Sequence, residues 1–388
     1  MPSNAELSLL IDALGERFED EPRLISREPY GRGSIAGFAV TERAAVAFGD
    51  DSLEGTTTTT WYVDTSGRSV ETETGLVLGD PERPSARIWL HPADPRLPAL
   101  APASFEGSAS TLLARLGIEL EAPPELIAYR AGKRAVFRMR GSAGTTFLKV
   151  VRPAAVEDLA RVHTELADAG LPVPRIIAWG AIGLLVIPMA EGDALSRRIA
   201  DLDPEALLNA LDRMRTILGA VDLRRPARRS LTTRVNWYVE RARAAAASDE
   251  QLAEVVERAV SLLGERDSGR RQTIHGDLHV GQLFVQGVEV SSLIDVDTAG
   301  LGNPVDDEAA FIGHLVATAA MRSASGWPSE PIVRLAEAAV ARWGAAGDPL
   351  ELRHALLVHV LGHALMPAER GDAQLACSIV ETGLALVA

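Results

Sequence analysis

Residues 273–297 contain most of the polar side chains in this sequence that could perform chemistry. The stretch opens with His275-Gly276-Asp277-Leu278-His279, where the glycine beside Asp277 favours a loop. A carboxylate on a loop can orient a hydroxyl group and accept its proton. Downstream, Gln282 and Asp295 offer amide and carboxylate oxygens, which are the hard ligands that Mg²⁺ prefers. A proton acceptor beside oxygen ligands for magnesium is what phosphoryl transfer from ATP to a hydroxyl requires.

Two short apolar runs, 283–285 and 293–294, must position these groups. They flank a turn, which predicts a β-hairpin. The hairpin would bring Gln282, just before the first strand, close to Asp295, just after the second. Asp295 and Asp297 have strand spacing, so both could face one side of the strand.

The pattern resembles the signature of the aminoglycoside phosphotransferase family, whose protein-kinase-like members include choline, macrolide and maltose kinases. Their loop reads His-Gly-Asp-x-His-x-x-Asn, followed by Ile-Asp and a Gly-x-Pro-x-x-Asp segment. Residues 275–279, 294–295 and 303–307 match these motifs in order. The resemblance implies ATP and Mg²⁺ as cofactors, Asp277 as the catalytic base, and Asp307 as the residue that helps anchor the loop.

The resemblance also implies the metal ligands. Gln282 stands where the family has its metal-binding Asn, and in this it is similar to maltose-type kinases. Asp295 takes the place of the second ligand. Asp297 is an additional acid, which is either a further metal ligand or a contact to a cationic substrate.

An N-terminal extension on this fold resembles the maltose- and glucosamine-type kinases, which favours a sugar or aminosugar as the substrate. The acids that could attract an amine are Asp297, Asp306, Asp307 and Glu308. We therefore expect Asp306 and Asp307 to contact the substrate, and His279 either to stabilise the loop or to reach the substrate. The alternatives are an antibiotic kinase that acts on aminoglycosides or macrolides, and a catalytically silent binding module.

The nucleotide should lie against a small sheet earlier in the chain. Lys149 ends a predicted strand, 145–150, and is the candidate for steadying the phosphates. His163 is on the inward stripe of the following helix, where it is either a core residue or a contact to Lys149 or a phosphate. We expect backbone groups of Ile187 and Met189, after the next strand, to bind the adenine.

For the whole chain we predict an α+β, bilobal, protein-kinase-like fold with a β-rich N-terminal cap. Short strands with turns predict a cap over residues 1–105, ending in a Pro-rich linker at 91–102. A sheet with one helix follows at 106–190. Helical periodicity dominates 191–388, which would form the larger lobe with the catalytic loop.

The composition narrows the function classes. A formal charge of −14 argues against general nucleic-acid binding, which needs basic surface. A single cysteine excludes an intrachain disulfide, and no uncharged apolar stretch reaches membrane-spanning length. We expect a cytoplasmic monomer or homodimer whose partner is a small molecule with a hydroxyl group.

Two further signals favour structural roles. His359 and His363 have the spacing of a helical zinc site, but the glutamate that metalloproteases place between such histidines is missing. Their apolar helical surroundings favour core or surface positions. The arginine-rich stretch 224–229 is interpreted as a solvated loop, with contact to an anion as the alternative.

Overall fold

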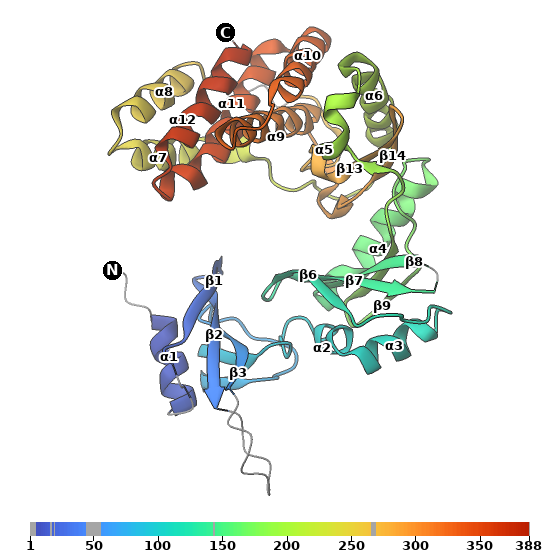
Figure 1. Ribbon diagram of the computed structural model, residues 1–388, viewed down its shortest axis with the longest axis vertical. Helices are drawn as coiled ribbons and strands as arrows, with labels where there is room; N and C mark the ends of the chain where they lie inside the picture. The colour runs from blue at the N-terminus through green and yellow to red at the C-terminus, as the bar shows by residue number, and fades with distance from the viewer. Residues whose placement is uncertain are drawn as a thin grey trace, which may run out of the picture. The chain divides into compact units, whose positions relative to one another are not determined.

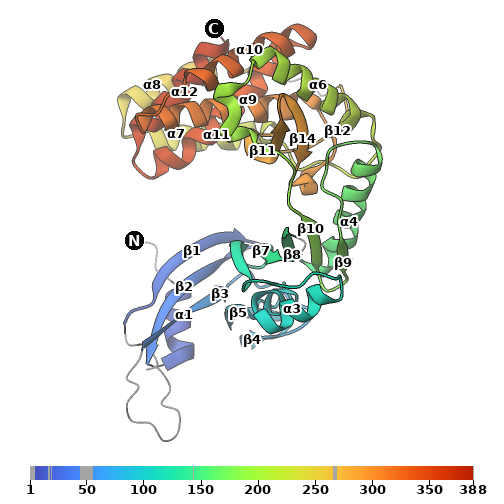
Figure 2. The same cartoon turned by 45° about the vertical axis from the view of Figure 1, so that its right-hand side comes forward.

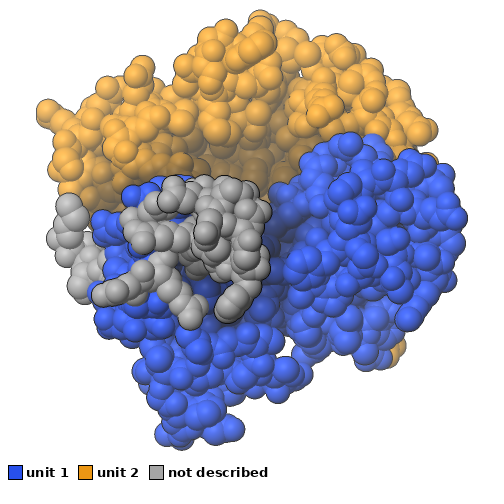
Figure 3. Space-filling model, turned by 60° about the horizontal axis from the view of Figure 1, so that its bottom comes forward, with its two compact units in different colours: residues 1–160, 176–189 blue, residues 161–175, 190–388 orange. Residues whose placement is uncertain are grey.

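The computed structural model describes residues 5–15, 18, 20–43, 56–142, 144–264 and 269–387. The chain divides into two compact units, which Figure 3 distinguishes by colour. The first unit comprises residues 1–160 and 176–189, which are the predicted cap and most, but not all, of the part predicted at 106–190. The second comprises 161–175 and 190–388. Helix α4 (Pro153–Asp168) begins in the first unit and ends in the second.

The N-terminal part of the first unit is an antiparallel sheet with one helix against it (Figures 1 and 2). Its strand order is β1-β2-β3-β5-β4. The predicted helix is present as α1 (Ala5–Leu14), and its Leu10 packs with Phe38 and Ile88 in a small core. The strands are β1 (Arg23–Tyr30), β2 (Gly33–Arg43), β3 (Thr56–Asp64), β4 (Leu76–Asp80) and β5 (Arg83–Leu90).

A second five-stranded sheet follows, in the order β6-β7-β8-β10-β9. Its strands are β6 (Glu125–Arg130), β7 (Arg134–Gly141), β8 (Gly144–Val151), β9 (Ala178–Gly180) and β10 (Leu184–Pro188). Two short helices, α2 (Leu100–Ser104) and α3 (Glu106–Ala114), pack on it. The Pro-rich stretch at 91–102 is not a free linker, because Leu97 and Leu100 are completely buried in the core of this sheet.

The two sheets of the first unit are joined by specific polar contacts. The carboxylate of Asp94 accepts hydrogen bonds from the Tyr129 hydroxyl at 2.8 Å and from the Gly132 N–H at 2.7 Å. Glu28 of the first sheet pairs with Arg130 and Lys133 of the second. These contacts fix the β-rich N-terminal part on the second sheet.

The second unit is mainly helical and has a single large hydrophobic core. Helices α9 and α11 contribute many of its fully buried residues, including Phe311, Leu315 and Leu356. Asn303 caps α9 and is followed by proline at the first helical position, a combination that fixes where the helix starts. The helices are α5 (Leu195–Arg198), α6 (Pro204–Ala220), α7 (Val235–Ala246), α8 (Glu250–Ser261), α9 (Pro304–Ala324), α10 (Glu330–Ala346), α11 (Pro349–Glu369) and α12 (Ala373–Val387).

Short strands carry the polar residues of the stretch 273–297. The predicted hairpin is present as β13 (Leu283–Gln286) and β14 (Glu289–Leu293), with β11 (Asp193–Ala194) on its outer edge. Strand β12 (Gln272–Ile274) pairs with β15 (Gly300–Gly302). The predicted α+β class, β-rich at the N-terminus and helical at the C-terminus, is confirmed. Within the described ranges, no helix is long and apolar enough to cross a membrane.

Candidate active site

The loop between β12 and β13 is fixed from behind by Asp307 of α9. Its two carboxylate oxygens accept the backbone N–H groups of His275 and Gly276, at 2.7 and 2.8 Å. Asp307 is only 2% exposed, and burial raises the pKa of its carboxyl. The expected anchoring role fits this geometry, whereas the expected substrate contact does not, because the carboxylate is occupied beneath the loop.

The loop geometry also depends on Gly276. Its φ of +82° is the left-handed conformation that glycine adopts without strain. A Cβ at this position would lie 2.5 Å from the carbonyl oxygen of Thr298. The Thr298 hydroxyl donates to the His275 carbonyl at 2.8 Å, and the buried His275 ring Nε2 lies 3.1 Å from the Ile294 carbonyl oxygen. The loop is therefore bound to the end of the hairpin as well as to α9.

The hairpin brings together the two predicted metal-binding positions. The Ile294 N–H donates to the Gln282 carbonyl at 3.0 Å, so the residues flanking the two strands are adjacent. Gln282 is 4% exposed, and its side-chain oxygen Oε1 has no hydrogen-bond partner in the described structure. A buried amide oxygen without a donor is costly in a protein interior, and a cation would satisfy it.

The expected strand geometry of Asp295 and Asp297 is wrong. Strand β14 ends at Leu293, and Asp295 has a φ of 57° in the left-handed region. Asp297 then lies in a 3₁₀ turn (Val296–Thr298). The change in chain direction at Asp295 removes the alternation that would have placed both acids on one side. Positive φ at a residue other than glycine is uncommon and recurs at functional sites.

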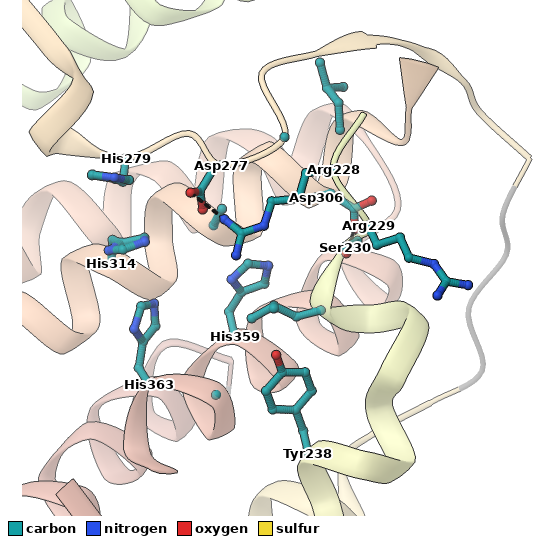
Figure 4. A pocket seen from close by; sticks show the side chains of 15 residues that line it. Arg228, Arg229, Ser230, Tyr238, Asp277, His279, Asp306, His314, His359 and His363 are labelled. Carbon is teal, nitrogen blue, oxygen red and sulfur yellow. Dashed lines mark hydrogen bonds and ion pairs between the residues drawn. The ribbon is translucent and has the colours of Figure 1, made fainter. Parts of the chain in front are cut away.

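Asp277 lies at the wall of a pocket with a volume of about 290 Å³ (Figure 4). Its Oδ2 accepts a hydrogen bond of 2.7 Å from Nη1 of Arg228, drawn as a dashed line in Figure 4. Arg228 belongs to the arginine-rich stretch that the sequence suggested was a solvated loop. Arg228 is half exposed, as that interpretation expects, and its guanidinium also makes the alternative contact to an anion, because it binds the predicted catalytic carboxylate.

Backbone pairing explains how the arginine-rich stretch reaches the loop. The N–H groups of Ala227 and Arg228 donate to the carbonyls of Leu301 and Thr298, at 3.2 and 2.9 Å. Gly300 makes this approach feasible, because a Cβ there would lie 2.5 to 2.6 Å from backbone atoms of residues 225–227. The stretch therefore pairs with β15 through an isolated parallel bridge between Pro226 and Leu301, and Arg228 is held beside Asp277.

Histidines form a second wall of the pocket. His279 stacks on His314 of α9 with ring centroids 4.3 Å apart, and His314 meets His363 of α11 edge-on at 4.5 Å. His359, one turn before His363, also lines the pocket (Figure 4). The ring nitrogen Nδ1 of His279 accepts the N–H of Gly281 at 3.1 Å, so this side chain both caps the loop and faces the pocket. Its two expected roles are compatible.

Burial keeps these histidines neutral. Burial, with a smaller contribution from neighbouring histidines, lowers the pKa of His314 to about 2, that of His359 to about 3 and that of His363 to about 4. His359 and His363 were expected in core or surface positions, yet both line the pocket beside Asp277. The spacing of the two histidines, one turn apart on an apolar helix, was the sequence feature that could have indicated a functional role. Nothing in the sequence, however, placed α11 next to residues 275–279.

The four acids that were expected to attract an amine are dispersed. Asp306 lines the pocket, but its Oδ1 accepts the hydroxyl of Ser230 at 2.7 Å. Glu308 forms a buried ion pair with Arg215 and does not line this pocket. Asp307 lies beneath the loop, and Asp297 is absent from the pocket lining. The expectation of an acidic, amine-binding site is therefore wrong for three of the four.

The predicted nucleotide-binding residues lie on the second sheet and α4. Lys149 is in β8, the central strand, between Val136 of β7 and Leu185 of β10, and is 7% exposed. Lysines on exposed edge strands often serve only to maintain solubility, and the burial of Lys149 in a central strand excludes that role. His163 is buried on the inward face of α4, as its spacing predicted.

The expected adenine contacts at the end of β10 need a correction. The N–H of Met189 donates to the Thr145 carbonyl at 3.2 Å, so it is not available to a base. Ile187 is paired with Phe147 two residues earlier, and antiparallel alternation turns its backbone groups toward β8 as well. The Pro188 carbonyl lies between them and faces the other way. The sequence did not reveal the strand register, and therefore did not show which backbone groups of β10 are already used by β8.

Comparisons with solved structures find proteins that share the broad arrangement. Aminoglycoside phosphotransferase APH(4)-Ia, in a ternary complex with ADP and hygromycin B, is 14% identical, with a TM-score of 0.47 over 71% of this chain and 96% of that one. Macrolide 2'-phosphotransferase MphH from Brachybacterium faecium is 21% identical, with a TM-score of 0.45 over 70% of this chain and 97% of that one. No curated protein matches this chain.

The profile of the phosphotransferase enzyme family matches residues 125–355, which is more than half of the chain. The match includes the second sheet, α4, the loop of Asp277, the hairpin and α9. It leaves out the N-terminal sheet and most of the last two helices. The resemblance read from the motifs is confirmed, and the chain belongs to the phosphotransferase enzyme family.

Proposed function

We propose that this protein transfers the terminal phosphoryl group of ATP to a hydroxyl group of a small molecule, with Asp277 as the general base. The observation that carries the proposal is the position of Asp277. Its carboxylate faces a pocket, while Asp307 and the hairpin with Gln282 and Asp295 hold its loop. A proton acceptor and the metal-binding positions are thus parts of one rigid structure, and positioning supplies most of the catalysis of phosphoryl transfer.

Asp277 would orient the acceptor hydroxyl and take its proton as the oxygen–phosphorus bond forms. Because Arg228 already binds Oδ2, the carboxylate is held in a defined orientation toward the pocket. The neutral histidines give this wall a weakly polar surface that can hydrogen-bond to hydroxyl groups without attracting or repelling charge.

Gln282 and Asp295 fit the needs of Mg²⁺. Among the described residues, no group of three or more His, Cys, Asp or Glu side chains converges as a metal site would. Mg²⁺ in kinases uses one or two carboxylates, with the remaining ligands supplied by phosphates and water. The Asp295 carboxylate and the unsatisfied Oε1 of Gln282 match that need, and Asp297 is kept as a further candidate. Bound Mg²⁺ would neutralise phosphate charge during transfer.

The second sheet would bind the nucleotide. We assign Lys149 to the phosphates and the Pro188 carbonyl to the amino group of adenine, in place of the expected backbone groups of Ile187 and Met189. His163 is assigned to the packing of α4 near this region. These assignments are supported by the burial of Lys149 in a central strand and by the register of β10.

The leading acceptor is a compact sugar or sugar derivative. A pocket of about 290 Å³ is at the lower end of the range for ligand sites, which favours a small acceptor over a macrolide. The second candidate acceptor is an aminoglycoside or macrolide antibiotic. A different function, that of a catalytically silent binding protein, is the third possibility.

A phosphorylation screen with Mg-ATP across sugars, aminosugars, sugar acids and antibiotics tests the proposal. We expect Asp277→Asn to reduce kcat on any accepted substrate by about 10² to 10⁴, the usual contribution of a general base. Asp222→Asn, an exposed acid outside the pocket, is the matched control and should keep full activity. Turnover by Asp277→Asn at the wild-type rate would show that Asp277 is not the base.

A further inference from the structure

A second cavity, with a volume of about 470 Å³, adjoins the pocket of Asp277. The two share part of their lining, namely Arg228, Arg229, Ser230, Ile274 and Asp306. Beyond this shared wall, the second cavity adds Arg271 and the hydroxyl-bearing Thr232 and Thr233. A molecule whose hydroxyl meets Asp277 could therefore extend toward three arginines.

The charges around this cavity do not cancel. Arg228 is paired with Asp277, but Arg229 and Arg271 form no ion pair in the part of the chain that the structure describes. The nearest acid in the lining, Asp306, accepts hydrogen bonds from the hydroxyls of Ser230 and Thr232. The whole chain has a formal charge of −14, whereas two unpaired arginines give the wall of this cavity a local positive charge.

The backbone that leads to Arg228 and Arg229 is held in place. Backbone hydrogen bonds fix residues 225–228 along β15, and Gly300 permits the close approach. Arg271 directly precedes β12, which pairs with the other side of the same strand region. Figure 4 shows Arg229 on the opposite side of the pocket from His279, His314 and His363. Arg229 thus lies apart from these three histidines, whereas the guanidinium of Arg228 lies between Asp277 and His359.

We propose that this wall is an anion-binding subsite, and that the acceptor carries a carboxylate or phosphate group which Arg229 and Arg271 bind while its hydroxyl lies at Asp277. The inference rests on the proposed function and specifies its acceptor class. Guanidinium groups with neighbouring hydroxyls are the side chains best suited to planar or tetrahedral oxyanions. A polycationic acceptor would meet like charge at the same wall.

The second cavity is better suited to the acceptor than to the nucleotide. Gln282 and Asp295, the positions that would bind magnesium with the nucleotide phosphates, line neither cavity. Asp277 and the histidines line the first cavity, Arg271 lines the second, and Arg228 and Arg229 line both. The cationic cavity therefore continues the acceptor pocket.

The first experiment tests the subsite without requiring turnover. The thermal denaturation midpoint is measured in increasing inorganic phosphate, with chloride keeping the ionic strength constant. Phosphate should raise the midpoint of the wild type and of the control Arg224→Gln, an exposed arginine that lines neither cavity. The double variant Arg229→Gln/Arg271→Gln should lose most of that shift. Equal shifts in all three proteins would overturn the proposal.

The second experiment tests the acceptor class with three matched hexoses, namely glucose, glucosamine and glucuronate, each with Mg-ATP. We expect kcat/KM to be highest for glucuronate and lowest for glucosamine. The double variant should lower the glucuronate value on the order of tenfold or more, and that of glucose by a much smaller factor. Preference for glucosamine, or a double variant that raises only the KM for ATP, contradicts the proposal.

The two readouts separate this inference from the proposed function. If phosphate stabilises the wild type through Arg229 and Arg271 but no acceptor of any charge is phosphorylated, the anion site stands and the kinase assignment fails. If acceptors are phosphorylated through Asp277 with no dependence on Arg229 or Arg271, the kinase assignment stands and the anion site fails.

Discussion

The two sides of the catalytic loop are built in different ways. On the metal side, Gln282 and Asp295 flank one short hairpin, so a single local turn brings them together. On the acceptor side, Arg228, His314 and His363 come from three separate segments, and the Arg228–Asp277 pair spans 49 residues. The metal side therefore depends on local geometry and the acceptor side on long-range packing. The chemistry of a family can stay with the first while substrate choice changes through the second.

The metal side is tested most directly at Asp295. We expect Asp295→Asn to weaken Mg-ATP binding by about 100-fold, because a charged ligand is lost. Asparagine tolerates the left-handed conformation that Asp295 adopts, so the fold should not change. Isothermal titration with and without Mg²⁺ measures the effect. Asp297→Asn is the matched comparison, and a larger loss at Asp297 would move the metal ligand to the 3₁₀ turn.

The connection between the two sides is Asp307. Asp307→Ala should lower the free energy of unfolding by about 2–5 kcal/mol, because two buried N–H groups lose their acceptor. Urea denaturation gives the stability, and kcat should fall with it as the loop loses its anchor. Glu308→Ala, at the next position on α9, would also destabilise but should spare the loop. Identical activity losses in the two variants would mean that Asp307 has no special role.

This contrast explains what the sequence could predict. Asp277, Gln282 and Asp295 follow from motif spacing, and the hairpin between them follows from two apolar runs around a turn. The sequence did not indicate that residues 225–228 pair with β15, since that approach depends on the missing side chain of Gly300. Nor did it show that α11 brings His359 to the pocket. The register of β10 could not be predicted, because nothing in residues 184–189 specifies which backbone groups face β8.

The acceptor side can be tested at Arg228. We expect Arg228→Gln to reduce kcat by up to about tenfold, because the carboxylate of Asp277 loses the group that orients it. The free energy of unfolding should change little, since Arg228 is half exposed and such ion pairs contribute ~0–1 kcal/mol. Steady-state kinetics and urea denaturation separate the two effects. A loss of stability with unchanged kcat would reassign Arg228 to a structural role.

The smallest expected effect concerns His359, and it is visible only as a function of pH. Burial lowers the pKa of His359 to about 3 in the folded protein, against about 6.5 when unfolded. The unfolded chain therefore binds more protons between these values, and the free energy of unfolding falls as the pH decreases from 6.5 toward 3. One histidine contributes at most ~1.4 kcal/mol per pH unit to that decline.

His359→Gln should remove this contribution while leaving stability near pH 7 within about 1 kcal/mol of the wild type, because glutamine is polar and of similar length. Urea denaturation at pH 7, 6 and 5 should give a shallower decline for the variant, so that the two stability curves converge or cross toward acid. Parallel curves would mean that His359 titrates normally and that the histidine wall is solvated. Water would then reach the histidine wall despite the packing of α9 against α11. The hydroxyl groups of the acceptor would be bound through water molecules as much as by the histidines.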